Sequence, residues 1–86
     1  MNHEVIREFA LRFPDVTEGF PFDETSLVFK VHGKIFAILS LNRQPARVNL
    51  KNSPERNLEL REEYEWILPG YHANKQHWNT VIASEY

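Results

Sequence analysis

The fold is decided by residues 27–41, which read LVFKVHGKIFAILSL. Apolar and β-branched side chains fill both halves of this stretch, and the pair His32-Gly33 between them suits a two-residue β-turn. The sequence therefore predicts a hairpin with strands over residues 27–31 and 34–41. The second strand is apolar on both faces, which predicts a central strand covered on both sides.

A helix is expected before this hairpin, because apolar residues recur there at helical spacing: Val5, Ile6, Phe9, Ala10 and Phe13. Asn2 can cap the start of this helix, and Pro14 ends it. Gly19 and Pro21 break any regular pattern in residues 15–23, which are expected to form an irregular or edge segment.

A strand and a second helix are expected after the hairpin. Residues 47–51 alternate between polar and apolar side chains, so Val48 and Leu50 are expected to point inward. The pair Ser53-Pro54 supplies a cap and a first helical residue, which predicts a helix to about residue 64.

The last apolar segments complete the predicted sheet. Leu58 and Leu60 on the second helix are expected to be partly buried, and residues 78–82 are typical of a final strand with Trp78 in the core. The order helix, hairpin, strand, helix, strand predicts an α+β domain built on a small antiparallel sheet with flanking helices.

Length and composition limit what this chain can be. Its 86 residues predict a single domain over residues 1–86. The absence of cysteine excludes disulfides and thiolate metal ligands. The N-terminus lacks the basic start and apolar run of a signal peptide, and no apolar run approaches the ~18 residues of a membrane helix. A cytoplasmic protein that does not enter the membrane is therefore expected.

Catalytic and metal-binding motifs are not found in the sequence. The serines lie in no nucleophile motif, and the three glycines form no phosphate-binding loop. His72 and His77 have no carboxylate near them, whereas a zinc site usually needs three or four protein ligands. We therefore expect no enzyme activity, no cofactor and no metal site.

Charge is segregated along the chain although the net charge is only −2. Residues 27–51 carry five basic side chains and no acidic one, and acidic segments lie on both sides of them. Such segregation predicts a positive face. Four of its side chains are expected to contact phosphates from the sheet: Lys30, Lys34, Arg47 and Lys51. The alternative is a solvated face whose lysines prevent strand pairing with other molecules.

Residues 69–81, which read PGYHANKQHWNTV, form the densest polar segment and contain no acid. Its hydrogen-bond donors and aromatic rings could hold an anionic or base-bearing ligand, and His72, Asn74 and Lys75 are the candidates. The alternative is structural, because Asn and Thr side chains also satisfy the backbone of a tight turn.

Four stretches resemble the MmcQ/YjbR family of small bacterial proteins: residues 13–22, 27–37, 48–55 and 69–81. The resemblance implies a fold like that of the bacterial frataxin CyaY, and DNA binding through a double-wing arrangement of β-hairpins. Relatives continue past the last strand with a C-terminal helix, whereas this chain stops at Tyr86. An open apolar sheet face is therefore expected, with the protein a monomer or a weak homodimer through that face.

Two hypotheses about function follow. The first is a non-enzymatic DNA-binding protein that contacts phosphates through the basic sheet face and the His/Lys-rich turn. The alternative is a protein- or small-ligand-binding module with no nucleic-acid role. That module would use the open apolar face or a pocket lined by Phe22, Tyr71 and Trp78.

Overall fold

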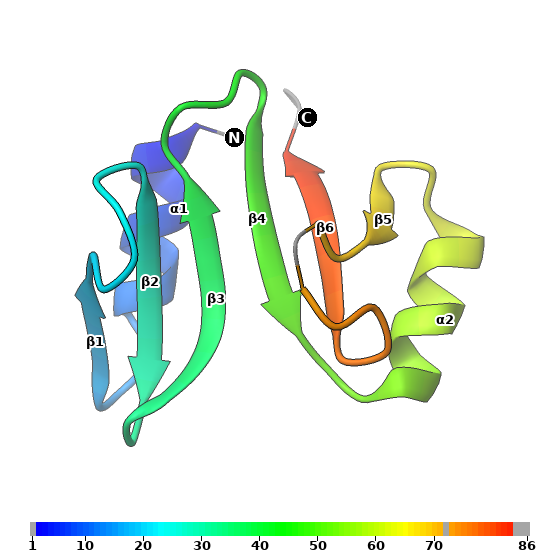
Figure 1. Ribbon diagram of the computed structural model, residues 1–86, viewed down its shortest axis with the longest axis horizontal. Coiled ribbons are helices and arrows are strands. Elements are labelled where there is room, and N and C mark those ends of the chain that lie inside the picture. Colours follow the sequence, from blue (N-terminus) through cyan, green and yellow to red (C-terminus); the bar gives the residue numbers. More distant parts are fainter. Residues whose placement is uncertain (1, 72, 84–86) are drawn as a thin grey trace.

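Six antiparallel strands form one sheet in the order β1-β2-β3-β4-β6-β5 in the computed structural model, which describes residues 2–71 and 73–83 (Figure 1). Two helices complete the α+β fold that the sequence predicts. The elements in chain order are α1 (His3–Leu11), β1 (Val16–Gly19), β2 (Ser26–Val31), β3 (Lys34–Ser40), β4 (Ala46–Lys51), α2 (Pro54–Glu63), β5 (Ile67–Pro69) and β6 (Trp78–Ala83).

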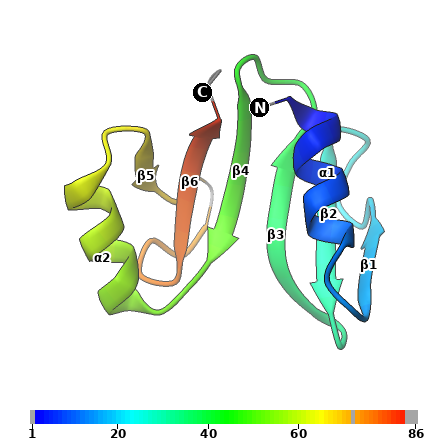
Figure 2. The same ribbon diagram turned by 180° about the vertical axis from the view of Figure 1, so that it is seen from behind.

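Helix α1 covers one face of the sheet at the end formed by β1, β2 and β3 (Figure 2). The predicted cap is confirmed, because the Asn2 side chain accepts a hydrogen bond of 2.9 Å from the Val5 amide. A two-pronged ion pair ties the helix to the edge strand, with Arg7 Nε 2.7 Å from Glu18 Oε1 and Arg7 Nη2 2.6 Å from Glu18 Oε2. This pair raises the pKa of Arg7, through its hydrogen bond to Glu18 first and the Coulomb attraction second.

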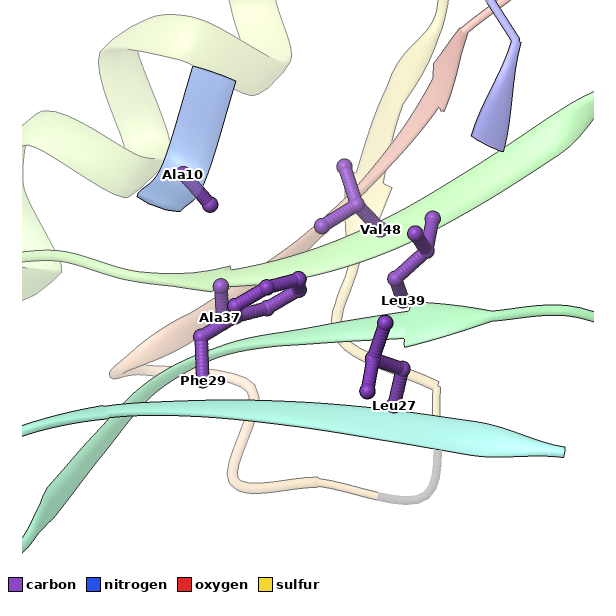
Figure 3. Close-up of a cluster of buried hydrophobic side chains, with 6 residues drawn as sticks. All are labelled: Ala10, Leu27, Phe29, Ala37, Leu39 and Val48. Carbon is purple, nitrogen blue, oxygen red and sulfur yellow. The ribbon is translucent and has the colours of Figure 1, made fainter. Parts of the chain in front are cut away.

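The core lies between α1 and the strands beneath it. Ala10 of α1 points at side chains of the sheet, and Phe29 and Leu39 are fully buried there (Figure 3). The rings of Phe29 and Phe36 add an aromatic contact with centroids 6.4 Å apart. The buried cluster consists of Ala10, Leu27, Phe29, Ala37, Leu39 and Val48.

The predicted hairpin is confirmed. His32 and Gly33 connect β2 and β3 with φ of 50° and 77°, and a turn with two positive φ angles matches the twist of antiparallel strands. The pairing register shifts between Phe29 and Lys30, which marks a bulge in this hairpin.

The prediction that β3 is covered on both sides is wrong. Ala37 and Leu39 are buried under α1, but Ile38 and Ser40 on the opposite face are only half-buried. Both helices pack elsewhere, so this face of β3 is bordered by loops alone. The apolar residues of β3 therefore indicated a central strand but not a second covering layer.

Helix α2 begins at the predicted cap, where Ser53 accepts a hydrogen bond from the Arg56 amide. Its buried residue is Asn57, whereas Leu58 is 56% exposed, so the expectation of a partly buried Leu58 is wrong. The Asn57 side chain donates to Gln76 O at 2.9 Å and to Asn52 O at 3.2 Å. Burial here follows hydrogen bonding to a neighbouring loop and not apolarity.

Two short strands, β1 and β5, complete the sheet, and β1 is an edge strand within residues 15–23, where an irregular or edge segment was expected. Trp78 is half-buried at the start of β6 instead of lying in the core. Backbone approaches closely at this point, because a Cβ placed on Gly70 would lie 2.7 Å from Trp78 Cβ. Among the described residues, no helix is long and apolar enough to cross a membrane.

An apolar hollow of about 280 Å³ opens on the helix-bearing side of the sheet. Phe9 of α1 and Phe13, just beyond the end of α1, form one wall with edge-to-face rings 5.6 Å apart, and both residues are more than half exposed. Leu50 of β4, expected to point into the core, is 38% exposed in this hollow. The other lining residues are Ile6, Ala10, Phe29, Phe36, Ala37, Val48, Val81 and Ala83.

Candidate functional site

A polar cleft of about 400 Å³ lies on the sheet face opposite α1; we call it the arginine cleft. Side chains alternate along a strand, so the neighbours of the core residues on β3, β4 and β6 form its floor. Residues of the β1–β2 loop and of the start of the β5–β6 loop line its walls. These two loops lie on opposite sides of β3 and β4 (Figure 1). Its lining residues are Phe22, Asp23, Thr25, Ser26, Ile38, Ser40, Asn42, Arg43, Arg47, Asn49, Tyr71, Ala73 and Thr80.

Asp23 fixes the wall that the β1–β2 loop forms. Its carboxylate accepts hydrogen bonds from the amides of Thr25 at 2.9 Å and Ser26 at 2.8 Å, and from both hydroxyls at 3.2 Å. These bonds, the Thr25 amide first and the Ser26 hydroxyl next, hold the pKa of Asp23 below its usual value. The neighbouring residue Phe22 therefore belongs to a turn that these hydrogen bonds order.

A closed set of hydrogen bonds fixes the opposite wall. The Tyr71 amide donates to Thr80 Oγ1 at 2.9 Å, and the Thr80 hydroxyl donates to Asn49 Oδ1. Asn49 Nδ2 then donates to Tyr71 O at 3.0 Å. Thr80 lies on β6 and Asn49 lies opposite it on β4, so the sheet itself positions Tyr71.

Two arginines supply the positive charge of the cleft. Arg43 lies in the β3–β4 connection with its guanidinium carbon 5.7 Å from the centre of the Tyr71 ring, a cation–π distance. Arg47 is half-buried on β4. Within residues 2–71 and 73–83, neither arginine has a carboxylate within ion-pair distance, because the ion pairs join Arg7–Glu18, His32–Asp15 and Arg56–Glu59.

The predicted sheet cations are spread along the sheet and do not meet at one point. Arg47 lines the arginine cleft, whereas Lys30 lines a neighbouring pocket beside Phe20 and Pro21. Lys34 begins β3 and Lys51 ends β4, and both are exposed. Because β3 and β4 are antiparallel, these two lysines lie toward one end of the sheet and Arg47 toward the other.

The predicted turn residues have structural hydrogen bonds where the structure describes them. Asn74 Oδ1 accepts from the amides of Gln76 and His77, the capping role that the structural alternative expects. Lys75 Nζ donates to Gly70 O at 3.2 Å, across the same loop. His72 lies outside the described residues.

Helix α2 holds this loop in place through contacts that the sequence did not indicate. Arg61 donates from Nη2 to Lys75 O at 3.0 Å, and Asn57 donates to Gln76 O. An asparagine and an arginine on a polar helix are typical of a solvated surface, so no local pattern distinguishes them.

Several cleft residues were not among the predicted site residues: Arg43, Asn49, Thr80, Ser26 and Ser40. The alternation in residues 47–51 did place Asn49 on the same face as Arg47, which is the one available signal. Phe22 and Tyr71, proposed for a ligand pocket, both line the cleft, and Trp78 is not among its lining residues.

Across the described residues, no group of three His, Asp or Glu side chains lies close enough together to hold a metal ion.

The fold and this site define a small α+β domain whose sheet carries a cationic, aromatic-walled cleft on its open face. Residues 11–85 match the YjbR family model, and the chain belongs to the YjbR family. The uncharacterized protein YbdF of Escherichia coli O157:H7 is 41% identical over 83 residues, which are 96% of this chain and 68% of YbdF. The uncharacterized protein YjbR of Escherichia coli K12 is 30% identical over 81 residues, 94% of this chain and 69% of YjbR.

Two crystal structures resemble this fold. A Deinococcus radiodurans protein with a DUF419 domain matches with a TM-score of 0.87 and 40% identity, over 94% of this chain and 62% of that one. A Pseudomonas syringae protein matches with a TM-score of 0.78 and 28% identity, over 95% of this chain and 81% of that one. The chain thus spans less than two thirds of the Deinococcus protein.

Proposed function

We propose that this protein binds DNA through phosphate contacts at the arginine cleft and the sheet face around it, without catalysing a reaction. The supporting observation is that Arg43 and Arg47 reach one cleft and have no ion-pair partner within the described part of the chain. Guanidinium groups suit phosphate because their planar donors match its oxygens in pairs. Among the described residues that line the cleft, the acidic one is Asp23, and it already accepts four hydrogen bonds.

The surrounding lysines extend this surface. Lys30, on the same sheet face, and Lys51, at the exposed end of β4, have no carboxylate partner among the ion pairs of the described residues. Long flexible ammonium groups contact phosphates without reading bases. They would therefore add affinity and salt dependence.

Binding should be largely indifferent to base sequence. A helix that reads the major groove presents free basic and polar side chains to base edges. The single arginine of α1, Arg7, is occupied by Glu18, and Arg56 and Arg61 of α2 are engaged with Glu59 and with the β5–β6 loop. The helices also pack away from the cleft, so the sheet and its loops are the contacting surface.

A second candidate function, binding of a small anionic molecule, uses the same cleft. Its volume of about 400 Å³ lies in the usual range for small-molecule pockets. Phe22 and Tyr71 supply aromatic surface, and the two arginines supply charge. A free ligand of this kind would need no surrounding lysines.

The test is a titration of the full chain with fluorescent DNA, single-stranded and duplex, at roughly 50 and 200 mM salt. The variant Arg43→Ala/Arg47→Ala is compared with Arg12→Ala/Arg56→Ala, which removes the same charge from the C-cap of α1 and from α2. We expect the cleft variant to lose about 1.4 from the single-strand salt slope, at ~0.7 per phosphate contact, and the control to keep the wild-type slope. Equal slopes for wild type and cleft variant would refute the proposal, and so would absence of binding at the lower salt.

A further inference from the structure

The dimensions of the arginine cleft restrict which part of a nucleic acid can enter it. A volume of about 400 Å³ suits a single small molecule, whereas a B-form duplex is far wider. One nucleotide unit, with a base and a phosphate, is of the size that small-molecule pockets enclose. The interior of the cleft thus favours a nucleotide that is not stacked and paired in a helix.

Aromatic side chains border the cleft on two opposite loops. The residues Phe22 and Tyr71 are 63% and 56% exposed, and both line the cleft. Tyr71 also has the Arg43 guanidinium 5.7 Å from its ring centre, so a ligand there meets an aromatic ring and a cation together. Exposed aromatic surface in a cationic groove is the arrangement on which unpaired bases stack, because every base has a flat π-face. The alternative explanation, burial in the core, does not apply to residues that are more than half exposed.

Both aromatic residues stand on segments that hydrogen bonds have already ordered. The Asp23 carboxylate organises the loop that carries Phe22. The Asn49 and Thr80 side chains hold the backbone of Tyr71 from both its amide and its carbonyl. A preordered wall loses less entropy on binding, which makes stacking more effective.

The charged side chains of the cleft favour one position for the phosphate of a bound nucleotide. Arg43 lies over the Tyr71 ring at 5.7 Å, so one cation borders the Tyr71 side, and Arg47 places a second on the floor of the cleft. Asp23 lies with Phe22 on the other side, where an anion would be repelled. An anionic group is therefore directed to the arginines and the neutral base to the space between the walls.

We infer that the arginine cleft binds one unpaired nucleotide unit, with its phosphate at Arg43 and Arg47 and its base against Tyr71. This inference rests on the proposed function and sharpens it from DNA in general to an unpaired deoxynucleotide. The same unit occurs within a single strand and as a free deoxynucleoside monophosphate, and the experiment distinguishes these two sources.

The test compares three fluorescent probes of about 12 nucleotides: a single strand, the same strand in a duplex, and an abasic strand with the same phosphates. We expect the single strand to bind at least tenfold more tightly than the other two. Tyr71→Leu should weaken single-strand binding by roughly 5- to 150-fold, the range for lost base stacking, and leave abasic-strand binding unchanged. Phe20→Leu, an exposed aromatic residue outside the cleft, is the matched control and should change neither.

A free deoxynucleoside monophosphate is then used as the competitor, with the unphosphorylated deoxynucleoside beside it. Displacement by the monophosphate at a lower concentration than that of the strand would assign the free nucleotide as occupant, and the reverse order would assign the strand. Equal affinity for the single and abasic strands, or an unaltered affinity in Tyr71→Leu with its melting temperature preserved, would overturn the inference and leave the phosphate-binding proposal intact. If no probe binds at low salt, both fail.

Discussion

Replacing Thr80 by valine tests whether the sheet positions the Tyr71 wall. Thr80 is 3% exposed, and its hydroxyl both accepts from the Tyr71 amide and donates to Asn49 Oδ1. Valine has the same branched shape and a similar preference for strands, so little changes except the two hydrogen bonds.

The expected loss of stability follows from the groups left without a partner. A fully buried polar group that loses its hydrogen bond costs about 1–3 kcal/mol. Both bonds of Thr80 are only partly buried, so water can replace some of what is lost. We therefore expect the free energy of unfolding to fall by about 1–3 kcal/mol in total, and the melting temperature by roughly 4–24 °C for a domain of this size.

Urea denaturation followed by circular dichroism measures this change, with Thr17→Val as the matched control. Thr17 is exposed on β1, so its replacement should shift the unfolding free energy by less than about 0.5 kcal/mol. Amide hydrogen exchange gives a local measure, because the Tyr71 amide should exchange faster in the Thr80 variant. A Thr80→Val protein as stable as Thr17→Val, with unchanged exchange at Tyr71, would refute this account of the wall.

Three further predictions concern the turns around the sheet. Gly70→Ala should lower the free energy of unfolding by about 1–3 kcal/mol in urea titrations, because the new Cβ would lie 2.9 Å from Trp78 O, whereas Gly19→Ala meets nothing within 4 Å. His32→Asn should raise the melting temperature by a few degrees, since Asn-Gly is the preferred pair for a turn with two positive φ angles; an unchanged or lower value would contradict the turn assignment. The pKa of Asp23 is lowered in the folded protein, so its carboxylate stabilises the fold above the ordinary pKa near ~4, and this stabilisation is lost as pH falls through the folded pKa. Below about pH 4 the melting temperature of Asp23→Asn should therefore fall less steeply with pH than that of the wild type. Parallel curves of melting temperature against pH would contradict this.

Patterns of consecutive residues predicted most of the fold. The cleft was not predicted, because it depends on contacts between residues that are distant in sequence. The hairpin turn at His32-Gly33 and the helix cap at Ser53 are set by a few consecutive residues, and the structure confirms both. The cleft instead forms where two loops distant in sequence border β3 and β4. Hydrogen bonds to Asn49 and Thr80 hold Tyr71 at the cleft. Asn49 is 22 residues from Tyr71 and 31 residues from Thr80 along the chain. The hydrophobic periodicity of the sequence does not predict such hydrogen bonds.

The same limit explains why the burial predicted for Leu58 was wrong and why the burial of Asn57 was not foreseen. Hydrophobic periodicity assumes that a helix buries its apolar side chains against a core. Helix α2 lies against β5, β6 and the loop between them, whose carbonyls need donors, so Asn57 is 1% exposed and Leu58 is 56% exposed. The sequence predicted where the helix begins but not what it packs against.

A net charge of −2 does not argue against an anion site in this molecule, because charges act over a limited distance. Interactions between exposed charges are largely screened beyond about 10 Å at 0.1 M salt. The molecule measures 31 × 28 × 23 Å, so a ligand in the arginine cleft experiences Arg43, Arg47 and Asp23 far more strongly than carboxylates on the far side of the sheet. Glu18 and Glu59 are further neutralised by Arg7 and Arg56. An acidic protein with this layout gains nothing from long-range steering but still binds anions at short range, so the affinity of the cleft must come from its arginines and its ordered walls.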